Sequence, residues 1–107
     1  MTDLADTLRA ARALISAPER WVQGVYARTE AGGKLHNGWE TGAVRWCALG
    51  AIEHVTRRFV TAPIDDALLR GAGLERDADI YDYNDSHTHA EVLAMFDRAI
   101  ELAEEQS

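Results

Sequence analysis

The strongest constraint on the fold is an apolar pattern that runs from Val44 to Phe59. Its members recur every three or four residues, which places them on one side of a helix. They are Val44, Cys47, Ala48, Ala51, Ile52, Val55 and Phe59. Ala43, Trp46 and Gly50 continue a second apolar face at the same spacing. We therefore expect a central helix from about Thr41 to Phe59, buried on both sides. Because Gly50 costs a helix interior about 1 kcal/mol relative to alanine, it also indicates close approach by another element, such as a neighbouring hairpin.

Three further helices are predicted from apolar spacing and end signals. They cover residues 3–17, a short segment from Thr61 to Gly73, and a last segment that begins near Thr88. In the short segment, Pro63 suits the first turn of a helix and the glycine at its end suits a helix terminus. Thr88 and Glu91 form a capping box for the last helix.

The region near residues 21–39 differs in composition and predicts a β-hairpin. Its first part, Trp21 to Arg28, is rich in aromatic and β-branched residues, and a glycine pair after it supplies a turn. The return strand is expected from Leu35 to Trp39. We therefore predict a small α+β fold, mainly helical, with about four helices, a peripheral hairpin and one domain over residues 1–107.

Acidic side chains gather in the last third of the chain. Residues 75–107 hold ten Asp or Glu and two Arg, and the whole chain carries a net charge of −7. A negative field of this kind repels phosphate backbones and anionic membranes and attracts cationic surfaces. We therefore expect a basic protein partner rather than nucleic acid or a membrane.

Two features favour a soluble cytoplasmic protein. The longest unbroken apolar run, Trp46 to Ile52, is too short to span a bilayer, and the acidic start lacks the basic and apolar regions of a signal peptide. Cys47 is the single cysteine, which excludes an intramolecular disulfide and a cysteine-based zinc site. No phosphate-binding glycine loop or helical zinc motif occurs, so no cofactor is expected.

The segment from Asp79 to Glu91 concentrates the chemically active residue types. They are Asp79, Asp82, Asn84, Asp85, His87, His89 and Glu91. The part before Ser86 has no helical period, and the spacing of an EF-hand is missing. Because the two histidines of a His-x-His pair face opposite sides of an extended segment, a metal site needs further donors such as His36 or His54. We predict an ordinary loop and helix cap without a metal, and metal binding by the loop is the third alternative for function.

Cys47 is also a candidate nucleophile. Together with His87 or His89 and an orienting Asp85, it has the composition of a Cys/His catalytic triad, and His54 and Asn84 are alternative members. Its place on the buried stripe, well inside the expected helix, argues against that role, because an activated thiolate sits at a helix amino terminus and is partly exposed. A buried core residue is the favoured interpretation, and a Cys/His hydrolase or transferase is the alternative.

Aromatic side chains offer a second kind of site. Tyr81 and Tyr83 alternate among carboxylates and could present a binding surface, with the core as the alternative for one of them. The three tryptophans, at positions 21, 39 and 46, are expected to pack in the core or against the hairpin.

Three blocks of residues together resemble a family of small uncharacterised bacterial and phage proteins. The blocks are Trp21-x-Gln23-Gly24-x-x-Ala27-Arg28; Arg45-Trp46-Cys47-Ala48-Leu49-Gly50-Ala51; and Asn84-Asp85 with Thr88, Glu91-Val92 and Asp97-Arg98-Ala99. The resemblance implies a shared fold and leaves the activity open. It also points to one neighbourhood formed by Arg45, Trp46, Cys47, Asn84, Asp85 and Thr88. In that neighbourhood, Asn84 and Asp85 are expected to dock the last helix on the central one, with Arg45 as charge partner.

The function predicted from these observations is that of a non-enzymatic accessory or protein-binding module that acts through its acidic last third. A phage-associated inhibitor that occupies a nucleic-acid-binding surface is one concrete form of it. The candidate binding residues are Arg45, Trp46, Tyr81, Tyr83, Asn84 and Asp85.

Overall fold

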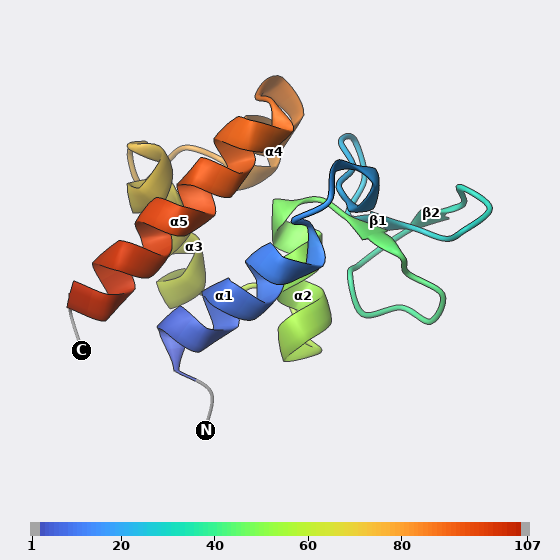
Figure 1. Ribbon diagram of the computed structural model, residues 1–107, viewed down its shortest axis with the longest axis horizontal. Helices are drawn as coiled ribbons and strands as arrows, with labels where there is room; N and C mark the ends of the chain where they lie inside the picture. The colour runs from blue at the N-terminus through green and yellow to red at the C-terminus, as the bar shows by residue number, and fades with distance from the viewer. Residues whose placement is uncertain (1–2, 106–107) are drawn as a thin grey trace.

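The computed structural model describes residues 3–105, and most of them are helical (Figure 1). The α-helices of this part of the chain are α1 (Leu4–Leu14), α2 (Ala48–Thr56), α3 (Ala62–Ala72), α4 (Ile80–Ser86) and α5 (His89–Glu105). A short 3-10 helix, η1, covers Pro18–Arg20, and the strands are β1 (Ala27–Arg28), β2 (Lys34–Leu35) and β3 (Arg45–Trp46). The small α+β fold, mainly helical, is confirmed, with one more helix than expected.

Several helix ends follow the sequence signals. Thr88 and Glu91 form the predicted capping box, in which the Thr88 amide donates to Glu91 Oε1 at 2.9 Å and the Glu91 amide to Thr88 Oγ1 at 3.1 Å. Pro63 stands in the first turn of α3, and Gly73 closes that helix in the left-handed conformation, with φ of 73°. These local signals were sufficient to place α3 and α5.

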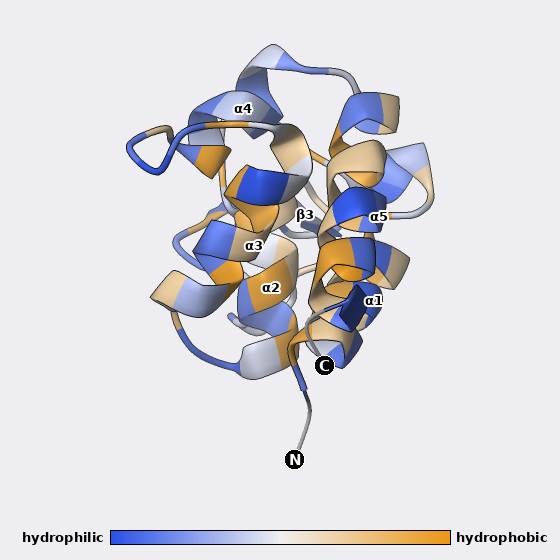
Figure 2. Ribbon diagram, turned by 90° about the vertical axis from the view of Figure 1, so that its left-hand side faces the viewer, coloured by the Kyte–Doolittle hydropathy of each residue, from blue (hydrophilic) through white to orange (hydrophobic). Residues whose placement is uncertain are grey.

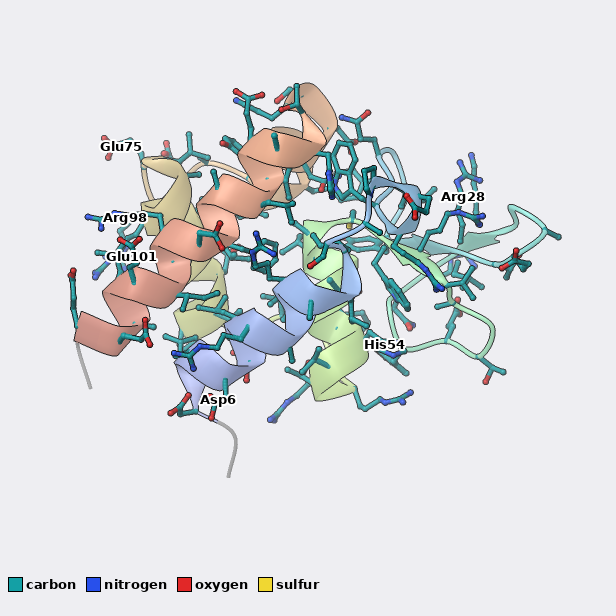
Figure 3. All side chains as sticks on the ribbon, in the orientation of Figure 1. Asp6, Arg28, His54, Glu75, Arg98 and Glu101 are labelled. Atoms are coloured by element: carbon teal, nitrogen blue, oxygen red, sulfur yellow. The ribbon has the colours of Figure 1, made fainter. Side chains whose placement is uncertain are left out.

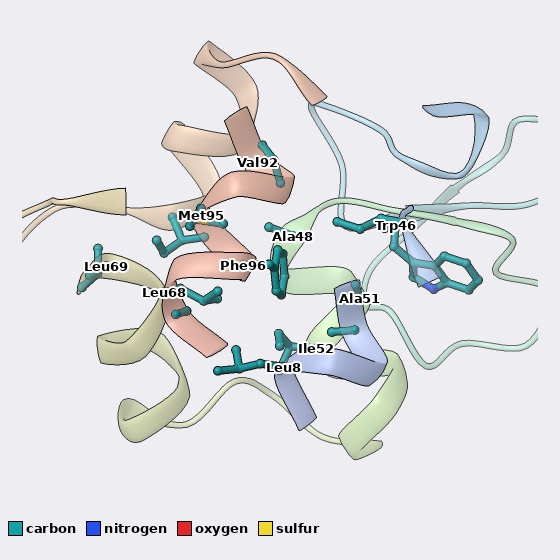
Figure 4. Close-up of a cluster of buried hydrophobic side chains, with 14 of the residues drawn as sticks. Leu8, Trp46, Ala48, Ala51, Ile52, Leu68, Leu69, Val92, Met95 and Phe96 are labelled. Carbon is teal, nitrogen blue, oxygen red and sulfur yellow. The ribbon is translucent and has the colours of Figure 1, made fainter. Parts of the chain in front are cut away.

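The core lies mainly between the helices, and Ala27 and Trp46 of the sheet extend it. Helix α5 packs against α1 and α3, and α1 packs against α2. Figure 2 shows the hydrophobic residues of α2, α3 and α5 concentrated where these helices face one another. Phe96 stands at the centre of this cluster with Leu8, Ile52 and Leu68 around it, all four fully buried (Figure 4). Within residues 3–105, no helix is long and apolar enough to cross a membrane.

The sheet lies at one end of the long axis, beyond α2 (Figure 1). Its strand order is β2-β1-β3, and both pairs are antiparallel. Ala27 pairs with Leu35 on one side and with Trp46 on the other. The peripheral hairpin is therefore confirmed, although its strands are shorter than expected and a third strand joins it.

That third strand corrects the prediction of a long central helix. Residues 45 and 46 are extended and hydrogen-bond with β1, so α2 begins at Ala48 rather than near Thr41. At its other end, α2 stops at Thr56 because Arg57 takes the left-handed conformation, with φ of 60°. Phe59, expected on the buried stripe, is 68% exposed. The apolar period alone could not separate a strand followed by a short helix from one long helix.

The glycine inside α2 does mark a close approach. A Cβ atom at Gly50 would lie 1.9 Å from the carbonyl oxygen of Tyr26, in the segment that leads into β1. The same carbonyl accepts a hydrogen bond of 3.1 Å from the Cys47 amide. Only glycine allows the backbones to come this near, so the interpretation of Gly50 is confirmed.

Helix α4 was not predicted. Its seven residues, Ile80–Ser86, come from a segment without a helical period. Asp79 caps it by accepting a hydrogen bond of 2.8 Å from the Tyr81 amide. A helix this short is marginal without tertiary contacts, which explains why local sequence does not reveal it.

Candidate functional site

Asn84 is a fully buried polar side chain that joins α4 to two other segments. Its Oδ1 accepts hydrogen bonds from Trp21 Nε1 at 2.7 Å and from the Ala48 amide at 3.0 Å. Its Nδ2 donates to the carbonyl oxygen of Val22 at 3.0 Å. One amide therefore fixes the start of α2, the segment before the sheet and α4 relative to one another.

The contact also completes the amino terminus of α2. The first amides of a helix have no partner within the helix, and a buried amide without a partner is costly. Asn84 Oδ1 accepts the hydrogen bond of the Ala48 amide, and Cys47 Sγ accepts a hydrogen bond of 3.3 Å from the Gly50 amide. The cap of α2 thus comes from a neighbouring residue and from a helix distant in sequence.

The carboxyl end of α4 also contacts the segment around Val22, through Gln23 and Gly24. Gln23 Nε2 lies 3.0 Å from the carbonyl oxygen of Asn84, 3.1 Å from that of Asp85 and 3.0 Å from that of His87, and its two N–H groups are shared among these three acceptors. The Gly24 amide donates to Asp85 Oδ1 at 2.8 Å. Because the last carbonyls of a helix also lack internal partners, Gln23 acts as a side-chain cap for α4.

Part of the neighbourhood expected from the family resemblance is present. Asn84, Asp85 and the backbone next to Cys47 do come together. The expected role of Arg45 is wrong: its Nε donates to the Glu19 carbonyl oxygen and its Nη1 to the Thr29 carbonyl oxygen, each at 3.1 Å. Arg45 therefore braces the turn regions around the sheet and does not pair with Asp85.

Trp46 is a core residue rather than a surface contact. Its side chain is 5% exposed, and its Nε1 donates to the Gly38 carbonyl oxygen at 3.1 Å. Its ring lies 4.8 Å from that of His54. A partner cannot reach this indole without a rearrangement of the core.

Cys47 occupies a position that the sequence did not predict. It is the N-cap of α2, not an interior residue, and this is where a helix dipole favours a thiolate. Burial has the larger effect, however: the side chain is fully buried, and burial raises the pKa of its thiol to about 12 despite hydrogen bonds from the Gly50 and Leu49 amides. Within residues 3–105, no histidine forms a hydrogen bond with Cys47. The thiol caps α2, and its burial and raised pKa both oppose activation as a nucleophile.

His87 and His89, which follow α4, contact different parts of the structure. The ring of His87 stacks on Tyr83 at 3.7 Å and 18°, and its Nδ1 lies 2.9 Å from the Tyr83 carbonyl oxygen. His89 Nε2 donates to the Ile15 carbonyl oxygen at 2.6 Å, and its ring lies 5.5 Å from that of Trp21. Among the residues that the structure describes, no three His, Cys, Asp or Glu side chains gather as a metal site.

Tyr81 and Tyr83 have different environments. Tyr83 packs against the core and against His87, so it fixes the end of α4. Tyr81 is half-buried and packs on Tyr26, with ring centroids 5.2 Å apart. Both predicted anchors are half-buried, and Tyr83 is the one of the two that packs against the core.

The ten carboxylates of the last third are all exposed, but they differ in their partners. Asp97 pairs with Arg12 at 2.6 Å, Glu104 pairs with Arg9, and Glu101 pairs with Arg98 at 2.9 Å. The first two pairs join α1 to α5, and the third lies within α5. Six other carboxylates lie near α4 and form no ion pair with a described Arg, Lys or His side chain. We call this set the acidic segment; it consists of Glu75, Asp77, Asp79, Asp82, Asp85 and Glu91. Arg76 is the single Arg or Lys among residues 75–91. Glu75 and the cationic Arg28 of the sheet project toward opposite ends of the molecule (Figure 3).

These features define a small, mainly helical α+β protein with a peripheral sheet. The chain belongs to DUF6197, a family of unknown function that matches residues 1–102. No curated protein and no solved structure matches the chain. The membership confirms the predicted resemblance to an uncharacterised family, whereas the bacterial and phage origin stays a prediction.

Trp21, Gln23 and Gly24 are the site residues that the sequence analysis did not select. They were read as part of a strand, yet Trp21 and Gln23 supply side-chain donors to α4 and Gly24 a backbone donor. The available signal was the polar Gln23 followed directly by Gly24, which is atypical of a strand interior. Their partners, 61 to 64 residues away, could not be read from local sequence.

Replacing Asn84 by alanine tests the role of the buried amide. The variant leaves the Ala48 amide, the Val22 carbonyl and the Trp21 indole without their partner, so we expect a loss of about 3 to 5 kcal/mol in the free energy of unfolding. Urea denaturation followed by tryptophan fluorescence measures it. Asp82→Asn is the control, because Asp82 lies on the exposed side of the same helix and its side chain forms no hydrogen bond or ion pair with a described residue. This variant should change stability by less than about 0.5 kcal/mol. Equal losses of unfolding free energy in both variants would contradict the structural role given to the Asn84 amide.

Alkylation of Cys47 tests the state of the thiol. Because the thiolate fraction at pH 8 is small when the pKa is about 12, iodoacetamide should react about a thousandfold more slowly with the native protein than with the urea-unfolded chain. Mass spectrometry over time gives both rates. A fast native reaction that titrates below about pH 8.5 would reveal an activated thiolate and would restore the Cys/His hydrolase hypothesis.

Proposed function

We propose that this protein is a non-enzymatic protein-binding module that engages a basic protein partner through the acidic segment. The observation that carries the proposal is the set of six exposed carboxylates around α4 that have no ion pair with a described basic side chain. Unpaired surface charge of one sign attracts a surface of the opposite sign and sets the approach of the two molecules.

The attachment of α4 supports this function. The Asn84 side chain lies on the buried side of α4, and Gln23 hydrogen-bonds to the carbonyl groups at the carboxyl end of this helix. The exposed Asp79, Asp82 and Asp85 therefore stand on a helix that is fixed before any partner arrives. A preorganised surface loses less conformational entropy on binding than a flexible loop with the same charges.

The partner that fits this surface is a protein rich in Lys and Arg. Nucleic acid and anionic lipid carry the wrong charge for it. A phage-associated inhibitor that covers the basic, nucleic-acid-binding surface of its target is one concrete form of the proposal. The alternative of a Cys/His enzyme has weaker support, because Cys47 is buried and its thiol pKa is raised to about 12.

A charge-neutral double variant tests the acidic segment. Asp77→Asn with Asp82→Asn removes two exposed carboxylates near α4 that form no side-chain contact, so folding should be unaffected. Two exposed charge pairs are worth about 1 kcal/mol together, and we expect about fivefold weaker binding of a fluorescent lysine-rich peptide at low salt. Fluorescence anisotropy measures the affinity, and added salt should weaken it further.

The matched control is Glu19→Gln with Glu30→Gln. Both are exposed carboxylates near the sheet, and the control removes the same net charge. Its affinity for the peptide should stay within about twofold of the unaltered protein. Equal weakening in the two double variants would mean that net charge alone governs binding, and it would overturn the proposal.

A further inference from the structure

A cleft of about 380 Å³ opens where the end of α2 meets the start of α3. It is separate from the Asn84 contacts and contains residues that the proposed function has not used. The lining residues that matter for its chemistry are Tyr26, Glu53, Phe59 and Asp65. Neither Arg nor Lys is among the residues that line it.

Glu53 places a largely buried carboxyl group in the lining of the cleft. The residue is 3% exposed, and its Oε1 accepts a hydrogen bond of 3.0 Å from the Gly38 amide. Within residues 3–105, no hydrogen bond uses its Oε2. Since Glu53 is part of the cleft lining, this second oxygen is available to a group that enters the cleft. Among the described residues no buried side-chain oxygen or nitrogen lacks a hydrogen-bond partner, so Oε2 is accessible to solvent. A cationic or donating group in the cleft can take the place of solvent water there.

Two aromatic rings form walls of the same cleft. Phe59 is 68% exposed, the one large hydrophobic side chain exposed to that degree among the described residues. It is held edge-on against Trp39, with ring centroids 5.0 Å apart and planes at 74°. Tyr26 is a second aromatic residue in the lining. Aromatic faces attract a guanidinium or ammonium group through their electron density.

Asp65 is the second carboxyl group in the lining of the cleft. It is half-buried near the start of α3. Burial, and after it the charges of Asp66 and Asp79, raises the pKa of its carboxyl group. Burial also raises the pKa of the Glu53 carboxyl group, and burial followed by the charge of Glu53 raises that of the Tyr26 hydroxyl. All three shifts have the direction expected of a site that lacks a positive charge.

We propose that this cleft receives an arginine side chain of the basic partner, with the guanidinium against Glu53 and Asp65 and between the rings of Tyr26 and Phe59. The inference rests on the proposed function and assigns it a specific anchor. A planar guanidinium can donate to a carboxylate and stack on an aromatic ring at the same time, which an ammonium group does less well. A metal ion fits poorly, because no three carboxylate, histidine or cysteine side chains gather among residues 3–105.

The cleft and the acidic segment are neighbours, so one partner can cover both. Tyr26 of the cleft packs on Tyr81 of α4 at 5.2 Å. The charge of Asp79, at the start of α4, acts on both Tyr26 and Asp65. An arginine in the cleft and further basic side chains along α4 therefore belong to one continuous contact surface.

The probe for this inference is N-acetyl-arginine amide, with N-acetyl-citrulline amide as its uncharged analogue. Titration followed by ¹H–¹⁵N NMR should shift the amides of Glu53, Phe59 and Asp65 with the arginine probe and leave them in place with citrulline. Glu53→Gln keeps an oxygen for the Gly38 amide and removes the charge, so it should weaken the probe at least about fivefold. Glu30→Gln is the matched control and should leave its affinity unchanged.

Phe59→Ala provides a second variant that does not touch the core, because the ring is exposed. It should weaken the arginine probe about two- to fivefold through the loss of one aromatic wall. Equal shifts with citrulline, or an unchanged affinity in both Glu53→Gln and Phe59→Ala, would overturn the inference. That failure is distinguishable from failure of the proposed function, which depends on the response of the lysine-rich peptide to the Asp77 and Asp82 substitutions.

Discussion

The side-chain amide of Asn84 is the contact on which the arrangement of this protein depends. It is fully buried, and it satisfies three polar groups from two segments that lie far from it in sequence. Buried polar groups are tolerated only when they are hydrogen-bonded, so these groups constrain one another strongly. The start of α2, the segment around Val22 and helix α4 therefore keep one relative position, and the sheet follows because the same segment leads into β1.

The sequence was informative where structure is local. The capping box at Thr88 and the glycine at the end of α3 follow from short-range rules of helix chemistry. The glycine inside α2 was a local signal that some element approaches there, although its partner, Tyr26, lies far away in the sequence. It was misleading where long-range contacts decide the structure. Residues 45 and 46 fit the apolar period of the following helix, yet pairing with β1 makes them a strand.

The candidate site shows the same division. The acidic excess could be read from the residues, and the proximity of Cys47 and Asn84 was implied by the family resemblance. Helix α4, the caps by Gln23 and Asn84, and the cleft at Glu53 could not be predicted from either. Each of these depends on partners more than ten residues apart. The position of Cys47 at a helix amino terminus does not by itself determine the pKa of its thiol. The helix terminus favours a thiolate, but burial has the larger effect and raises the pKa.

Hydrogen exchange at the Ala48 amide is the most direct test of the central role of Asn84. The first amide of a helix normally exchanges quickly, since it has no partner within the helix. Here it donates to the buried Asn84 Oδ1, whereas the Ala62 amide at the same position of α3 has no side-chain cap. The account predicts that Ala48 is protected nearly to the level of global unfolding and that Ala62 exchanges freely. Equally fast exchange at Ala48 and Ala62 would contradict it.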